Sequence, residues 1–272
     1  MKWRNIDFDY SSAGNAAFGV VLVVVLYRFL SNTLLSQMSY PPLLNEESEW
    51  VYVWLLRSGL PHGLTGNFTA AFAFDVLLIA SPVMYLLTRS RIFAVITTLS
   101  LTLYFMIFNM VIGHHYHGLV GAIVVTLPFW TKQENKFALM WQGARYYLLY
   151  IFASAALWKI FRGSVFHQGQ LAAILEAQQI YYLVENAESI RSAWIAYLLK
   201  HPRVSDALLW MNVLLQLGFA VGFITRRYDN VLLLLFAMFV VLNYVVMGIL
   251  SAELLALAPV LFPLRSAVLN EK

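Results

Sequence analysis

The chain has 272 residues, of which 61% are hydrophobic and 12% charged, and its formal net charge is +4. Soluble globular domains contain about twice this share of charged residues, so the composition excludes an ordinary soluble protein and predicts a multi-pass membrane protein. The positive balance is then typical of cytoplasmic loops rather than of a nucleic-acid partner. The absence of cysteine excludes disulfides, thiolate catalysis and thiolate-bound metals.

Apolar stretches along the chain predict eight transmembrane helices, since a helix needs about 20 mostly apolar residues to cross a bilayer. Their approximate ranges are 16–35, 68–88, 92–112, 113–130, 146–170, 206–225, 229–249 and 252–265. Two further segments, 37–67 and 162–205, are too polar to span and rich in aromatic residues, which is typical of interfacial helices. The sequence predicts an all-α polytopic membrane bundle of about eight helices, with interfacial helices on the outer side, in a single integral membrane domain (1–272).

The basic residues predict the orientation of this bundle. With a cytoplasmic N-terminus, the inner segments hold Lys2, Arg4, Arg89, Arg91, Lys132, Lys136, Arg145, Arg226, Arg227, Arg265 and Lys272. This distribution obeys the positive-inside rule. We therefore expect an integral protein of a bacterial cytoplasmic (inner) membrane, with both termini cytoplasmic and both interfacial segments outside.

Polar residues within the predicted spans share one depth. The outer halves of the helices hold Arg28, Asp75, Asn109, Asn212, Asn243 and Glu253, and the outer ends hold His114 and Lys159. Ionisable residues inside a membrane are costly and mark functional sites by default, so this pattern predicts a cavity open to the outside. The alternative is a buried ion pair that fixes the bundle, in which Asp75 pairs with Arg28 or Lys159.

Two histidines at the start of the fourth predicted span are candidate site residues. His114 and His117 are three residues apart and share a helix face. Such a pair could bind zinc or copper, but without a nearby carboxylate it does not predict a metal site. A neutral imidazole that binds a substrate oxygen or transfers a proton fits better. For Lys159 the alternative to a functional role is a side chain that extends to the headgroups.

Two segments carry a family resemblance: GHHYHGLVGAIVVTLPF at 113–129 and ARYYLLYIFASAALWKIFRGSVFHQGQLAAIL at 144–175. Together they resemble the hallmark segments of the membrane domain of vitamin K-dependent gamma-glutamyl carboxylases, within the wider set called HTTM proteins. The large, mainly β extracytoplasmic domain of the eukaryotic enzymes has no counterpart before Lys272, so recognition of a glutamate-rich protein is not expected. The matching positions are His114, Tyr116, Lys159, Phe166 and Gly169.

The resemblance implies a reduced quinone, similar to vitamin K, that enters an outer-leaflet cavity from the lipid. Lys159 would be the base that starts its oxygenation, and His114 would stabilise the quinol oxyanion in the same cavity. Further ligand-binding residues are expected at Tyr116, His117, Arg28, Asp75, Asn109 and Trp158.

Three function classes remain open at this point. The first is a carboxylase-like or quinol-dependent membrane oxidoreductase, with the bilayer and a lipid-soluble small molecule as partners. The second is a non-enzymatic membrane subunit, immunity factor or assembly factor that binds a protein through its outer face. The third, a small-solute transporter, is disfavoured because the sequence has no inverted repeat.

Overall fold

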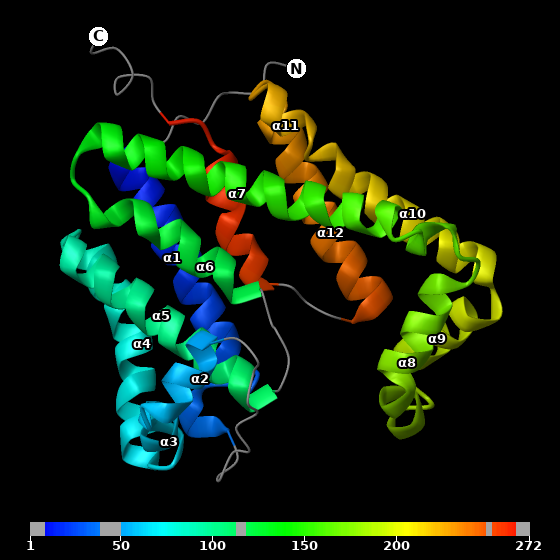
Figure 1. Cartoon of the computed structure of the whole chain (residues 1–272), viewed down its shortest axis with the longest axis horizontal. Coiled ribbons are helices and arrows are strands. Elements are labelled where there is room, and N and C mark those ends of the chain that lie inside the picture. Colours follow the sequence, from blue (N-terminus) through cyan, green and yellow to red (C-terminus); the bar gives the residue numbers. More distant parts are fainter. Residues whose placement is uncertain (1–8, 39–49, 113–117, 249–251, 265–272) are drawn as a thin grey trace. The chain divides into compact units, whose positions relative to one another are not determined.

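A computed structural model describes residues 9–38, 50–112, 118–248 and 252–264 (Figure 1). All regular elements in these ranges are helices, which confirms the all-α prediction for this part of the chain. The sequence predicts one domain, whereas the contacts between residues divide the chain into two compact units. Unit 1 comprises Met1–Arg145 and Ala252–Lys272, and unit 2 comprises Tyr146–Ser251.

Unit 1 packs its helices around a cluster of aromatic rings. The Phe18 and Tyr85 rings stack with centroids 3.6 Å apart, and Phe129 meets Phe18 edge-on at 5.3 Å. Such a cluster fixes α1 against α4, because large aromatic side chains dominate core packing. The described elements of the unit are α1 (Tyr10–Leu30), η1 (Leu35–Gln37), α2 (Trp50–Arg57), α3 (Leu60–Thr65), α4 (Phe68–Thr88), α5 (Arg91–Ile112), α6 (Gly118–Thr126), η2 (Leu127–Trp130), the first part of α7 (Glu134–Phe161) and η4 (Ala252–Leu261).

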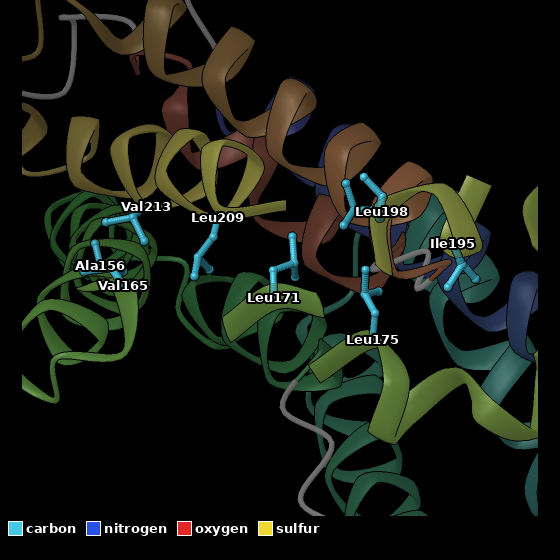
Figure 2. Packing of buried hydrophobic residues seen from close by; sticks show 9 residues of the cluster. Ala156, Val165, Leu171, Leu175, Ile195, Leu198, Leu209 and Val213 are labelled. Carbon is cyan, nitrogen blue, oxygen red and sulfur yellow. The ribbon is translucent and has the colours of Figure 1, made fainter. Parts of the chain in front are cut away.

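Unit 2 is built around α10, which packs against both α8 and α12 (Figure 1). Its described elements are the second part of α7, η3 (Ser164–Phe166), α8 (Gln170–Glu185), α9 (Ile190–Lys200), α10 (Pro202–Gly218), α11 (Val221–Ile224) and α12 (Asp229–Met247). Buried aliphatic side chains gather between these helices, as Figure 2 shows. They are Ala156, Val165, Leu171, Leu175, Ile195, Leu198, Leu209, Val213 and Val246.

Five helical segments among the described residues are long and apolar enough to cross a membrane, which supports a multi-pass membrane protein. They are Tyr10–Gln37, Phe68–Thr88, Arg91–Val111, Pro202–Ile224 and Asp229–Met247. The other three predicted spans are not among these five: 146–170 falls on α7 and the segment after it, Gly118–Trp130 is a shorter apolar helix, and η4 is a 3-10 helix of 10 residues. The last two are each only about 20 Å long, against about 30 Å of bilayer hydrocarbon. The count of eight spans therefore stays a prediction.

Short helices occupy both segments that the sequence assigns to the membrane interface. Within 37–67 the structure has α2 and α3, and within 162–205 it has η3, α8 and α9. Their helical character agrees with the prediction. Their depth in a bilayer and the orientation of the termini remain predictions.

The helix α12 ends at a glycine, Gly248, that lies directly against the Arg191 side chain. Gly248 has φ 66°, in the left-handed region, and its N–H donates to the Tyr244 carbonyl. The Arg191 guanidinium donates to the Met247 carbonyl at 3.0 Å and to Gln179 Oε1 at 2.7 Å. A Cβ atom at position 248 would overlap this guanidinium. Gly248 thus allows Arg191 to attach α12 to α8.

Gly248→Ala is expected to lower the free energy of unfolding by at least about 1–2 kcal/mol, the cost of a left-handed non-glycine residue. Displacement of Arg191 adds to this loss. Thermal unfolding in detergent measures the effect. The matched control is Gly19→Ala within α1, where a Cβ meets no atom within 4 Å and the φ angle is ordinary, so alanine should not destabilise the protein. Equal melting temperatures for the two variants would contradict the expected role of Gly248.

Candidate functional site

Unit 2 contains a cavity of about 250 Å³ with a polar side and apolar walls. The polar side chains come from three helices: Lys159 from α7, Asn212 and Gln216 from α10, and Asn243 from α12. A few polar groups within an apolar hollow are typical of small-molecule sites. The apolar walls are formed by Leu171, Ile174, Leu208, Leu209, Phe239, Leu242, Val246 and Met247.

Lys159 is positioned by the way α7 ends. The helix stops two residues later, and Gly163 adopts the left-handed conformation with φ 72°. The Ser164 hydroxyl donates to the Lys159 carbonyl at 3.0 Å, which satisfies one of the last carbonyls of the helix. The Lys159 side chain reaches α10, where its Nζ donates to Gln216 Oε1 at 2.7 Å. Lys159 therefore contributes to the cavity, unlike a lysine that extends to the headgroups.

Amide side chains continue this polar surface across α10 to α12. Asn212 and Gln216 are four residues apart and therefore share one face of α10. Asn212 Nδ2 donates to Asn243 Oδ1 at 3.1 Å. Among the described residues, the buried Asn212 Oδ1 has no hydrogen-bond donor. A buried acceptor without a partner costs about 1–3 kcal/mol, so this atom can accept a hydrogen bond from a bound molecule.

A hydrogen bond from Gly169, the N-cap residue of α8, attaches the α8 wall of the cavity to α10. Gly169, at the start of α8, has φ 76°, and its N–H lies 3.0 Å from both carboxyl oxygens of Asp206 on α10. Just before it, the Phe166 ring packs edge-on against Trp210 at 5.5 Å. These contacts hold Leu171 and Ile174 at the cavity. Two positions of the family resemblance, Phe166 and Gly169, thus have a local structural role.

The charge of Lys159 is not balanced by a carboxylate in the part of the chain that the structure describes. Lys159 takes part in no ion pair among the described residues, and the ion pair between Arg28 and Glu253 lies in unit 1. Lys159 instead bonds the neutral amide of Gln216. Because a cation in an apolar environment is costly without a compensating charge, the cavity favours a molecule with an acidic or anionic head.

Arg28, one of the predicted ligand-binding residues, forms a buried ion pair. Its Nη2 lies 2.7 Å from Oε1 of Glu253, and its guanidinium covers the Phe108 ring at 4.5 Å. The pair joins α1 to η4. The alternative interpretation of the polar set, a buried ion pair that stabilises the fold, therefore applies to Arg28, with Glu253 as its partner.

Asp75 does not pair with Arg28, and that part of the prediction is wrong. Its two carboxyl oxygens accept hydrogen bonds from the backbone N–H groups of Leu35, at 3.1 Å, and Ser36, at 2.8 Å. The physical reason is that η1 begins beside α4 and leaves its first N–H groups without helical partners. The other predicted partner, Lys159, belongs to unit 2 and bonds an amide there.

Two further predicted ligand-binding residues, Asn109 and Trp158, do not line the cavity. Asn109 is buried and donates to the Tyr52 hydroxyl at 3.1 Å. Trp158 is 59% exposed, is covered by the Arg162 guanidinium at 4.3 Å, and is not among the described residues that line the cavity. The shared site of His114 and Lys159 stays a prediction, because the described residues do not include His114, Tyr116 and His117.

The sequence placed Asn212 and Asn243 among the polar residues of a predicted outer cavity, but it gave no role to Gln216, the amide that Lys159 contacts. The available signal was the spacing of Asn212 and Gln216, one helical turn apart in an apolar helix. Two amides on one face of a spanning helix need partners, since lipid offers none. This signal would have predicted a polar contact between α10 and its neighbours.

Comparison with protein-family models, with curated proteins and with solved structures gives no match. The described helices are those of a multi-pass membrane protein by length and apolar composition, and unit 2 contains a cavity lined by Lys159 and three amide side chains. The function therefore has to be argued from the chemistry of that site.

Proposed function

We propose that this membrane protein binds a lipid-soluble molecule with an acidic hydroxyl head, of the quinol type, in the cavity of unit 2. The observation that carries the proposal is the amine of Lys159 at a cavity with largely apolar walls, bonded to an amide and not to a carboxylate. The resemblance to gamma-glutamyl carboxylases implies the same class of ligand and the same lysine. An aromatic ring fits walls formed by Phe239, Leu208 and Val246.

Proton transfer is the chemistry that this arrangement supports. A neutral lysine can take the proton of a quinol hydroxyl: the O–H bond breaks, an N–H bond forms, and the ammonium group then stabilises the oxygen anion. Gln216 would hold the amine in position through its Oε1. Asn212 Oδ1 would accept a hydrogen bond from a second hydroxyl of the ligand.

Replacement of Lys159 by methionine tests the proposal, because methionine fills similar space without the amine. Wild-type protein purified from native membranes is expected to carry a quinone or quinol, detected by mass spectrometry of extracted lipids. Lys159→Met should carry at least about tenfold less, the effect of losing a charge-assisted hydrogen bond. The matched control is Lys200→Met, an exposed lysine in the last turn of α9 that does not line the cavity.

Equal quinone content in Lys159→Met and wild type would overturn the proposed site. Equal melting temperatures of Lys159→Met and Lys200→Met in detergent show that a lost ligand reflects the site and not the fold. A stable protein partner without any bound quinone would instead support the non-enzymatic subunit that the sequence left open.

A further inference from the structure

A second hollow lies between α10 and α12 in unit 2. It is an open groove of about 380 Å³ with walls that are almost wholly apolar. Met211 and Leu215 line it from α10, and Met238, Val241 and Val245 line it from α12. Val241 is 61% exposed. Met211, Met238 and Val245 are also exposed, whereas Leu215 is buried. Both helices are long and apolar enough to span a membrane, so hydrocarbon is the medium expected around the groove.

Leu242 connects this groove to the cavity. Leu242 lines both hollows, so the cavity of Lys159 and the groove meet at this residue of α12. The cavity alone, at about 250 Å³, is smaller than the roughly 300–1,000 Å³ of small-molecule sites, whereas the two hollows together fall within that range. The cavity is therefore sized for a headgroup, and a longer ligand has to continue past Leu242.

We propose that the groove binds the apolar tail of the same molecule whose head binds at Lys159, an inference that rests on the proposed function. The ligand is then a single-chain amphiphile that enters sideways from the bilayer between α10 and α12. Two observations favour this occupant: the walls of the groove are almost wholly apolar, and the groove shares Leu242 with the cavity that Lys159 lines.

Affinity alone would be a poor measure of tail binding. Lipid chains are as apolar as the groove, so moving a tail from bilayer to groove gains packing contacts but little hydrophobic free energy. Ordinary bilayer lipids also lie against an exposed apolar face. A bound ligand tail differs from a bilayer lipid because it occupies the groove only when its own head is bound at Lys159.

Photolabelling of the protein in phosphatidylcholine vesicles tests this dependence. The probe is a decyl benzoquinol with a diazirine at the end of its tail, and labelled peptides are quantified by mass spectrometry. In wild type we expect labels on the groove residues Met211, Met238 and Val245 of α10 and α12. Excess unlabelled decyl benzoquinol, and separately Lys159→Met, should each reduce this labelling by about tenfold.

A bulky side chain in the groove provides a second test of the tail site. Val241→Trp should remove groove labelling, whereas Leu234→Trp, on an exposed part of α12 that lines neither hollow, should leave it unchanged. A benzoquinol without a tail should still compete with a head-labelled probe in Val241→Trp. That result shows that the cavity remains intact when the tail site is filled.

The outcomes separate the two proposals. Groove labelling that resists competition and persists in Lys159→Met would mean bilayer lipid contact only and would overturn the tail site. If Lys159→Met nevertheless weakens binding of the tail-free quinol, the proposed function survives. If Lys159→Met changes the binding of neither probe, the proposed function fails as well.

Discussion

Arg28→Gln is expected to destabilise unit 1 by about 3–5 kcal/mol, because it leaves the buried carboxyl group of Glu253 without its cation. Glu253→Gln should cost a similar amount by leaving the guanidinium unpaired. The double variant Arg28→Gln/Glu253→Gln should lose much less than the sum of the two single losses. Unfolding in detergent, followed by tryptophan fluorescence, gives the three values.

The coupling energy of this cycle identifies the partner of Arg28. Neighbouring groups that share an interaction show couplings of about 0.5–3 kcal/mol, whereas independent sites add. A second cycle with Arg28→Gln and Asp75→Asn is the matched control, since Asp75 bonds backbone N–H groups and not the guanidinium. A larger coupling in the Asp75 cycle than in the Glu253 cycle would contradict the pairing described here.

Two pairs of polar residues that the sequence placed at one depth are in contact in the structure, but the sequence did not predict which residues would be partners. Arg28 and Glu253 were placed at one depth, as were Asn212 and Asn243, and each pair is hydrogen-bonded or ion-paired in the structure. A count of residues along a helix gives depth at about 1.5 Å per residue. It does not say which helices are neighbours, because that depends on tertiary packing.

Lys159 could be found from the sequence because a cation in a spanning segment needs a reason to be there. The amides around it carry no charge, so the sequence gave Asn212 and Asn243 only a shared depth at a predicted cavity and gave Gln216 no role. Their importance comes from the packing of α10 against α12, which places Asn212 beside Asn243. The cavity itself is a property of three helices in unit 2 and has no signature in any one of them.

Hydropathy predicts a transmembrane helix at 252–265, but the described part of this stretch holds a shorter element, and a signal for this was present. The described part of that stretch is the 3-10 helix Ala252–Leu261, with Pro259 inside it. Proline lacks the N–H donor and obstructs an α-helix interior, so an apolar run of this length with a proline predicts a short element. Composition alone cannot distinguish a span from a buried segment, because both are apolar.

Asp75 was predicted as a ligand-binding residue, and its contacts give it a different role that substitution can test. Asp75→Leu is expected to lower the free energy of unfolding by about 2–6 kcal/mol, since it leaves the N–H groups of Leu35 and Ser36 without an acceptor, at about 1–3 kcal/mol each. Asp75→Asn keeps one carbonyl oxygen and should lose about half as much. Thermal unfolding in detergent measures both.

The matched control for Asp75 is its neighbour Val76, which is 48% exposed, so Val76→Leu should not change the melting temperature. Quinone content provides a second readout. Because the Asp75 carboxyl group bonds the backbone of η1 in unit 1, Asp75→Asn should retain the quinone that Lys159→Met loses. Loss of quinone in Asp75→Asn with an unchanged melting temperature would show that Asp75 is a ligand-binding residue, as the sequence predicted. Equal destabilisation by asparagine and leucine would show that the negative charge of Asp75, and not its capacity to accept two hydrogen bonds, stabilises η1.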